Sequence, residues 1–205
     1  MSETTQVFED LIKGRRSIRR YDARPIEQAT VDALLEAGTW APSAHNRQPW
    51  RFVVLTDAAA RETLAQRMGD RLREARLADG DDIADVEADA SRSFQRISRA
   101  PLVIVAFLTM EDMDVYSDPL RQSAEHLMAV QGVAMAVNNI LVAAQAEGLG
   151  ACWMCAPLFC SDAVVEATGA PEHWQAQALL TLGYAASKGK PASRKPLDQV
   201  VLRKP

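Results

Sequence analysis

Four arginines and one serine stand within six residues near the start of the chain, in Arg15-Arg16-Ser17-Ile18-Arg19-Arg20. Guanidinium groups bind phosphate oxygens in a bidentate manner, and a serine hydroxyl adds a neutral donor. The same chemistry recurs near the other end of the chain, in Arg194-Lys195-Pro196. Together the two segments predict an anion site. For the first segment alone, a solvated basic patch or a nucleic-acid contact is the alternative.

A polar loop, residues 41–50, is the second candidate for a binding site. Two prolines restrict its backbone, and Ser43, Asn46 and Gln48 offer neutral donors and acceptors. Such a loop suits the hydroxyls and amide edges of a planar ligand, and an ordinary capped turn is the alternative reading.

The third candidate is the glycine-rich apolar segment Gly148–Pro157, which reads G-L-G-A-C-W-M-C-A-P. Glycines allow a backbone to approach a ligand closely, and a plain buried strand is the alternative. Cys152 and Cys155 form a C-x-x-C pair, but on the strand we expect here, residues three apart face opposite sides. We therefore predict packing roles for both thiols. Without further ligands at zinc spacing, we also expect no metal site.

Hydrophobic periodicity and helix-breaking residues divide the chain into helices and short strands. We expect helices near 7–12, from about 25 to before 42, and at 58–77, 83–97, 119–147 and 161–168, with strands at 50–55, 102–108, 149–156 and 178–184. The order lacks regular βαβ alternation and a G-x-G-x-x-G loop, which favours an α+β fold over a dinucleotide-binding α/β fold. The length of 205 residues suits a single domain over 1–205.

The longest expected helix, Pro119 to Glu147, is rich in Ala, Val, Met and Leu on most of its faces. At about 1.5 Å per residue it spans about 42 Å, which is more than a small domain can hide. A second copy of the chain is the simplest cover, so we expect a homodimer. Polar residues such as Gln131 and Asn139 interrupt the helix and argue against a membrane span.

Composition limits the partners and the compartment. The net charge of -4 argues against the broad positive field that nucleic-acid binding requires. The start, MSETTQVFEDLIKG, has acidic residues and no apolar run, so we expect neither a secretion signal nor a transit peptide, and a cytoplasmic protein with reduced thiols.

Five features in order resemble the FMN-dependent nitroreductases, from about Phe8 to Val201: R-R-S-x-R, P-S-x-x-N-x-Q-P-W-x-F, a long helix, G-L-G-x-C-W and R-K-P-L. The run Ala124-Glu125-His126 ahead of Cys152-Trp153, together with Asp162 and the L-G-Y at 182–184, is similar to a narrower branch. That branch includes the FMN domain of enzymes that finish a deazaflavin cofactor.

The resemblance implies a central, mostly antiparallel sheet flanked by helices, with the long helix at a dimer interface. It also implies three groups of FMN contacts. The residues expected to hold the phosphate and the ribityl chain are Arg15, Arg16, Ser17, Arg19 and Arg194. The residues expected to reach the flavin from the second subunit are Pro42, Ser43, Ala44 and Asn46. The residues expected beside the isoalloxazine, with a backbone amide directed at its N5, are Met154, Cys155 and Ala156. Cys155 stands where many members have Gly or Glu, and residues 58–82 show no match for the helical Asn that many members place near the flavin pyrimidine.

The activity implied by the resemblance is a ping-pong reaction. NAD(P)H reduces FMN at N5, and small acceptors such as nitroaromatics, quinones or flavins reoxidise it, so we expect no catalytic side chain. Three alternatives stay open: a specialised FMN-dependent reductase or dehydrogenase of a deazaflavin-like biosynthetic intermediate, a non-catalytic FMN-binding module, and a basic-patch nucleic-acid binder.

Overall fold

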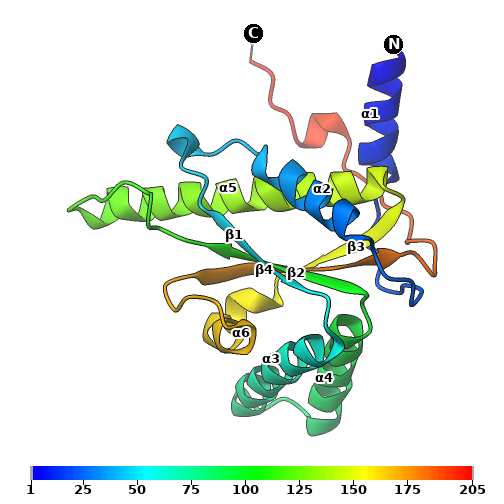
Figure 1. The fold of residues 1–205 in the computed structure, drawn as a ribbon. Coiled ribbons are helices and arrows are strands. Elements are labelled where there is room, and N and C mark those ends of the chain that lie inside the picture. Colours follow the sequence, from blue (N-terminus) through cyan, green and yellow to red (C-terminus); the bar gives the residue numbers. More distant parts are fainter. Residues whose placement is uncertain (1, 205) are drawn as a thin grey trace.

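A four-stranded antiparallel sheet lies at the centre of the computed structural model, which describes residues 2–204 (Figure 1). The strand order is β1 (Trp50–Leu55), β2 (Leu102–Leu108), β4 (Gln175–Tyr184) and β3 (Leu149–Met154). All three neighbouring pairs run antiparallel. β1 and β3 are therefore the edge strands of the sheet. The segment with the N-terminal arginines lies along β3, where Ser17 pairs with Ala151.

Helices cover both faces of the sheet (Figure 1). α2 (Gln28–Thr39) and α5 (Pro119–Ala146) lie on one face, and α3 (Ala58–Ala78), α4 (Ile83–Ser98) and α6 (Ser161–Thr168) lie on the other. The apolar run of β2 serves both sides, because successive side chains of a strand point to opposite faces. Alternate β2 residues accordingly enter two separate hydrophobic cores. Burying each such side chain contributes about 1.5–3 kcal/mol.

The long helix α5 begins and ends on clear signals. The Asp118 carboxylate accepts a hydrogen bond from the backbone N–H of Arg121 at 2.9 Å, Pro119 occupies the first turn, and Gly148, at φ 71°, follows the helix end. A Cβ at Gly38 of α2 would lie 2.9 Å from Cγ1 of Ile140, so only glycine lets α2 pack this closely on α5. By length and composition α5 could cross a bilayer, and its contacts with the sheet and α2 bury part of its apolar surface.

The N-terminal helix α1 (Glu3–Gly14) stands apart from the body of the protein (Figure 1). None of its residues is buried within the described part of the chain, and Val7, Phe8 and Ile12 are 55%, 59% and 46% exposed. The C-terminal segment after β4 is equally open, with Leu202 84% exposed. An amphipathic helix gains stability mainly by burying its apolar face, and within residues 2–204 no residue of α1 is buried.

Ion pairs join α3 to α4 into a helical hairpin. The Arg73 guanidinium contacts the Glu87 carboxylate at 2.8 Å, and Arg76 contacts Asp89. These hydrogen bonds lower the pKa of Glu87 and of Asp89 below the usual carboxyl range. The two acidic side chains of α4 that make these pairs lie in its first two turns. The C-terminal half of α4 makes no ion pair with α3 within residues 2–204.

The α+β class and the antiparallel sheet flanked by helices are confirmed, and several boundaries were wrong. α1 begins at Glu3, four residues before the start expected near Val7. The strand expected at 149–156 ends at Met154, because Cys155 leads into a 3-10 turn, Ala156–Phe159, that contains Pro157. β4 begins at Gln175, three residues before the expected start at Ala178. α2 begins at Gln28, so Pro25 precedes the helix rather than opening it.

Candidate functional site

The arginine segment forms a loop that lies along the edge strand β3. Ser17 forms a parallel bridge with Ala151, and the backbone N–H of Ile18 donates to the Ala151 carbonyl at 3.0 Å. A Cβ at Gly150 would lie 2.8 Å from Cβ of Ile18, so glycine at this position allows the close approach. The loop is thereby fixed against the sheet, and its Arg and Ser side chains extend from a rigid base.

Tyr21 fixes the other end of the loop. Its phenol donates to the Ile18 carbonyl at 2.5 Å and lies 2.9 Å from Oγ1 of Thr181 on β4. Burial raises the pKa of Tyr21, so the phenol remains a neutral donor. Its ring packs where Gly183 has no side chain, since a Cβ there would lie 2.8 Å from Cβ of Tyr21.

The loop and the C-terminal segment enclose a cavity of about 250 Å³ that we call the basic cradle. Its lining residues are Arg15, Arg16, Ser17, Arg19, Lys190, Ala192 and Arg194. The structure therefore brings together all five residues that the sequence predicted for a phosphate, across more than 170 residues of chain. Lys190 was missed, because a lone lysine in a basic tail gives no signal in the sequence.

The donor set of the basic cradle fits a phosphate group. Every polar side chain in its lining is a guanidinium, an ammonium or a hydroxyl, and no acidic residue lines it. Arg16 is partly engaged elsewhere, since its Nη1 donates to the carbonyls of Lys13 at 2.5 Å and Arg15 at 2.8 Å, at the end of α1. Arg15, Arg19 and Arg194 form no ion pair within residues 2–204, which leaves their charge available to a bound anion.

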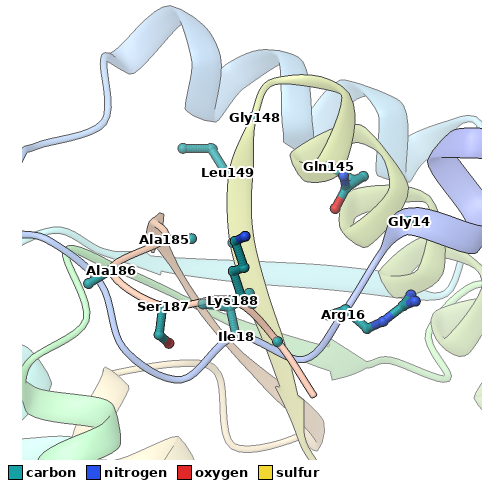
Figure 2. A pocket seen from close by; sticks show the side chains of 12 residues that line it. Gly14, Arg16, Ile18, Gln145, Gly148, Leu149, Ala185, Ala186, Ser187 and Lys188 are labelled. Atoms are coloured by element: carbon teal, nitrogen blue, oxygen red, sulfur yellow. The ribbon is translucent and has the colours of Figure 1, made fainter. Parts of the chain in front are cut away.

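A second cavity, of about 650 Å³, shares Arg16 with the basic cradle (Figure 2). It lies between the end of α5 and the segment 185–189, and its lining mixes glycines and small side chains with Gln145 and Lys188. In the view of Figure 2, Arg16 and Gln145 lie on one side of the β3 ribbon, and Ala185, Ala186 and Ser187 lie on the other. This cavity has no concentration of charge like that of the cradle.

A third cavity, of about 680 Å³, shares Arg19 with the basic cradle, and we call it the arginine pocket. Its lining residues are Arg19, Arg20, Tyr21, Arg92, Gln95, Arg96, Arg99 and Ala186. The α4 arginines were not predicted as site residues. Their signal was present nonetheless: positions 92, 96 and 99 follow the spacing i, i+4, i+7, which places them on one helix face.

The three cysteines are free thiols in different environments. Burial raises the pKa of the Cys152 thiol on β3, although the charges of Arg19 and Arg96 oppose the rise. Burial likewise raises the pKa of Cys160, whereas Cys155 is exposed beyond the end of β3. Cys152 and Cys155 therefore differ in exposure, and they lie on different elements rather than on the two faces of one strand, as the sequence predicted.

The predicted ring-contacting residues follow the cradle along the same strand. Met154 ends β3, Cys155 follows it, and Ala156 opens the 3-10 turn. Ala151, beside the arginine loop, lies four residues before Cys155, which is about 13 Å at about 3.3 Å per strand residue. None of the three lines the basic cradle itself. The two groups lie in order along β3 and the 3-10 turn that follows it, an arrangement that suits an elongated ligand with an anionic end.

The loop residues Pro42, Ser43, Ala44 and Asn46 lie away from the cradle of their own chain. They pack near the middle of α5, where a Cβ at Gly132 would lie 3.5 Å from Cβ of Ser43. None of them lines the cradle or the two cavities that adjoin it. The structure of one chain thus leaves the second predicted group separate from the first.

Three residues of this loop have strained backbone conformations. His45, Asn46 and Gln48 have φ values of 49°, 54° and 50°, in the left-handed region that non-glycine residues rarely adopt. Each such residue costs roughly 1–3 kcal/mol, and this strain persists only where the surroundings enforce it. The 3-10 turn Ala44–Asn46 contains two of the three.

Specific contacts enforce the loop conformation. The Ser43 hydroxyl accepts a hydrogen bond from the backbone N–H of Gln48 at 3.0 Å, and Arg47 forms an ion pair with Asp114 at 2.5 Å. Asp114 is held in turn, since its backbone N–H donates to the fully buried carboxylate of Glu125 on α5 at 3.2 Å. The loop is therefore preformed in the single chain.

Residues 12–184 match the model of the nitroreductase family. The chain belongs to this family. The NADH dehydrogenase of Thermus thermophilus is 30% identical over 212 residues, covering 92% of this chain and 91% of that protein. The 5,6-dimethylbenzimidazole synthase of Rhodobacter capsulatus is 30% identical over 177 residues, covering 85% and 81%. The family resemblance of the sequence is thus confirmed, and the synthase is consistent with the narrower branch.

Solved structures agree with this assignment. A nitroreductase from Desulfovibrio desulfuricans in complex with FMN has a TM-score of 0.73 and 27% identity, covering 100% of this chain and 98% of its own. An NADH oxidase from Clostridium acetobutylicum has a TM-score of 0.71 and 27% identity, covering 95% and 99%. The nitroreductase fold expected from the sequence is confirmed over nearly the whole chain.

Proposed function

We propose that this nitroreductase-family protein is an FMN-dependent oxidoreductase that draws electrons from NAD(P)H. The observation that carries the proposal is the basic cradle, which joins Arg15, Ser17 and Arg19 to Arg194 around a cavity of about 250 Å³ that no acidic residue lines. The relatives support it by name, as an NADH dehydrogenase, an NADH oxidase and a nitroreductase in complex with FMN.

The chain would hold FMN along the β3 edge. Arg15, Arg16, Ser17, Arg19 and Arg194 would bind the phosphate and ribityl oxygens, with Lys190 as an additional cation. The backbone from Met154 to Ala156 would lie beside the ring, where the edge strand β3 ends. Tyr21 holds the arginine loop in place and does not line the basic cradle.

Bound FMN supplies the transfer of two electrons from NAD(P)H to a small acceptor such as a nitroaromatic, a quinone or a flavin. The protein contributes orientation and positive charge, which stabilises an electron-rich ligand in a cavity partly shielded from water. The proposed reaction requires no proton-transferring side chain from the chain. Cys155, the exposed thiol beside the proposed ring position, has only a packing role in this scheme.

Ligand discrimination tests the cradle directly. In the variants Arg15→Ala and Arg194→Ala, FMN binding should weaken by about 1.5–3 kcal/mol, the worth of a charge-assisted contact, while riboflavin binding should hardly change. The matched control is Arg67→Ala on α3, whose guanidinium pairs with Glu166 outside the cradle. Equal losses for both ligands would show that these arginines do not meet a phosphate. A purified protein without a flavin absorption band would contradict the function itself.

The same proposal includes a homodimer with shared flavin sites. Apolar side chains of α1, of α5 and of the C-terminal segment are exposed in the single chain, among them Phe8, Leu127 and Leu202. The preformed loop Pro42–Asn46 lies away from its own cradle, which suits a loop that reaches the cradle of a second copy. Burying these surfaces together would form an interface in the obligate class, above about 2,000 Å².

Mixing two defective variants tests the sharing. Arg15→Ala damages the cradle and Asn46→Ala damages the loop, so a mixed dimer carries one site with both defects and one site with neither. Flavin reduction should therefore recover in part after subunit exchange. No recovery despite proven exchange, or a monomer with full FMN occupancy, would contradict shared sites.

A second candidate function is a specialised biosynthetic reaction on an intermediate. The relation to 5,6-dimethylbenzimidazole synthases, at 29% and 30% identity, favours it. Steady oxidation of NAD(P)H with simple nitroaromatics or quinones, at about 1 s⁻¹ or faster, would argue for the general reductase. If NAD(P)H reduces the flavin but neither nitroaromatics nor quinones reoxidise it efficiently, the specialised enzyme is favoured.

A further inference from the structure

We propose that Glu125 is a positioning residue for the flavin site of the second copy of the chain. The proposal rests on the proposed function and its shared sites, and it adds a residue that acts on the site through another segment. Glu125 lies on α5 and is the only fully buried carboxylate within residues 2–204. A buried carboxylate needs hydrogen-bond partners, and the partner of this one leads to the loop proposed to reach the second flavin.

The hydrogen bonding of Glu125 is incomplete. Its Oε1 accepts from the backbone N–H of Asp114 at 3.2 Å, whereas its Oε2 has no hydrogen-bond partner. Glu125 also forms no ion pair within residues 2–204. A carboxylate offers about four acceptor positions, and burying most of them unused is unfavourable. An apolar side chain of similar size would suit the packing better, so the fold alone does not explain this carboxylate.

The hydrogen bond that Glu125 does form fixes the residue that holds the strained loop. The carboxylate of Asp114 pairs with the guanidinium of Arg47 at 2.5 Å. Arg47 lies between Asn46 and Gln48, whose φ values are 54° and 50°. The backbone of Asp114 must be placed accurately for its carboxylate to reach Arg47, and Glu125 supplies that placement from a regular helix.

The helix α5 supports the same loop at a second point, seven residues further along. A Cβ at Gly132 would lie 3.3 Å from Cγ of Pro49 and 3.5 Å from Cβ of Ser43. Positions seven apart lie on one face of a helix, so Glu125 and Gly132 belong to the same face of α5. Close packing at Gly132 sets how near the loop lies to the helix, and Glu125 sets the orientation of the loop through Asp114.

The effect of Glu125 should fall on the flavin of the other copy. The loop Pro42–Asn46 lines no part of the basic cradle of its own chain, and the shared-site proposal has it reach the cradle of the second copy. A change at Glu125 should therefore leave the cradle of its own chain intact and weaken the FMN site that its loop completes. The carboxylate then serves the site and lowers stability, a trade-off that functional residues commonly show.

Two substitutions of similar size separate this role from a structural one. Glu125→Gln keeps an oxygen that can accept from Asp114, whereas Glu125→Met keeps the length of the side chain without an oxygen. FMN binding should weaken about tenfold in Glu125→Met, the low end for a hydrogen bond to a charged group, and stay near the wild-type affinity in Glu125→Gln. The Tm of FMN-free Glu125→Met should equal or exceed that of the wild type, because a buried group without its full set of partners is removed. The control His126→Ala removes a hydrogen bond to Gln175 of β4 and should leave FMN affinity unchanged.

Three results would overturn the proposal. Unchanged FMN affinity in Glu125→Met would show that the carboxylate does not act on the flavin site. Equal losses in Glu125→Met and Glu125→Gln would show that the oxygen bonded to Asp114 does not matter. A fall in Tm together with the loss of FMN would show that Glu125 only supports the fold.

Mixed dimers, purified through two different affinity tags, determine on which copy Glu125 acts. With Arg15→Ala as partner, Glu125→Met should form one intact FMN site, because its intact cradle meets the intact loop of the partner. With Asn46→Ala as partner, both loops are defective and no intact site should form. Flavin absorbance per dimer, at an FMN concentration near the wild-type Kd, measures the occupancy.

The reverse pattern would place the effect of Glu125 in the cradle of its own chain and would overturn the proposal. The mixed dimer of Arg15→Ala and Asn46→Ala serves as the reference. If this reference dimer forms no intact site, the shared sites of the proposed function are wrong, and the role of Glu125 at the second copy is wrong with them.

Discussion

Substituting Gly150 by alanine should loosen the arginine loop and weaken FMN binding together. The added Cβ would lie 2.8 Å from Cβ and Cγ2 of Ile18 and 3.0 Å from its Cγ1. Carbon atoms pack at about 3.5–4.0 Å, so the loop must move outward by most of an ångström. Overpacking of this kind costs about 1–3 kcal/mol, which lowers the Tm by several degrees in a protein of this size.

The same strain should appear in the affinity for FMN. If the loop relaxes outward in the FMN-free Gly150→Ala variant, FMN binding must push the loop back to its wild-type position. FMN binding is then weaker by up to about 1–3 kcal/mol, the cost of the overpacking. That corresponds to a Kd raised about 5- to 150-fold. Quenching of flavin fluorescence gives the Kd, and differential scanning fluorimetry gives the Tm.

Two further variants separate this explanation from general damage. Gly69→Ala adds a Cβ inside α3, 3.3 Å from the flexible end of Arg73, and should leave FMN affinity unchanged while stabilising the helix by up to about 1 kcal/mol. Ile18→Ala removes two of the three closest atoms, so combining it with Gly150→Ala should cost less than the sum of the single changes. Gly150→Ala with unchanged Tm and Kd, or strictly additive costs, would refute the close contact.

Three other predictions concern the thiols, the helical hairpin and the strained loop. Iodoacetamide should label Cys155 in the native protein, and Cys152 and Cys160 only after unfolding, because burial raises the pKa of both buried thiols; mass spectrometry locates the label. The pKa values of Glu87 and Asp89 are lowered in the folded state, so their ion pairs stabilise the hairpin above the usual carboxyl range near pH 4 and are lost as pH falls through the lowered values. Glu87→Gln should therefore flatten the acid side of a Tm-against-pH curve, and an unchanged curve would refute the pairing. Asp114→Asn removes the ion pair with Arg47, which is partly exposed, so the FMN Kd should rise less than tenfold, and a larger rise would show that the pair contacts the ligand.

Sequence patterns predicted the elements of this fold well, because the signals are local. The Asp118-Pro119 start of α5 is a cap and first turn that depend only on neighbouring residues, and the apolar run of β2 reflects burial on both faces. Two of the errors, at the end of β3 and at the start of α2, fall beside a proline. Cys155 is the example, since the 3-10 turn that contains Pro157 ends the strand before it.

The site was predictable only where its residues lie close together in the sequence or match a family motif. Arg15, Ser17 and Arg19 alternate along one loop, and Arg194 joined them through the resemblance rather than through any spacing. Arg92, Arg96 and Arg99 were overlooked because α4 reads as an ordinary charged surface helix until the fold places the arginine loop against it. Charge on one helix face becomes a site only when a distant segment faces it.

The preformed loop has a thermodynamic consequence for the proposed homodimer. His45, Asn46 and Gln48 adopt positive φ within a single chain, where the Arg47–Asp114 ion pair and the hydrogen bond from Asp114 to the buried Glu125 fix the neighbouring backbone. Association of two chains then need not order the loop, and FMN that contacts both chains binds a surface already in place. A ligand that binds only the dimer stabilises the dimer by mass action. FMN should therefore lower the dissociation constant of the dimer in proportion to its own affinity, and a cradle variant that loses FMN should dissociate at a concentration where the wild type does not.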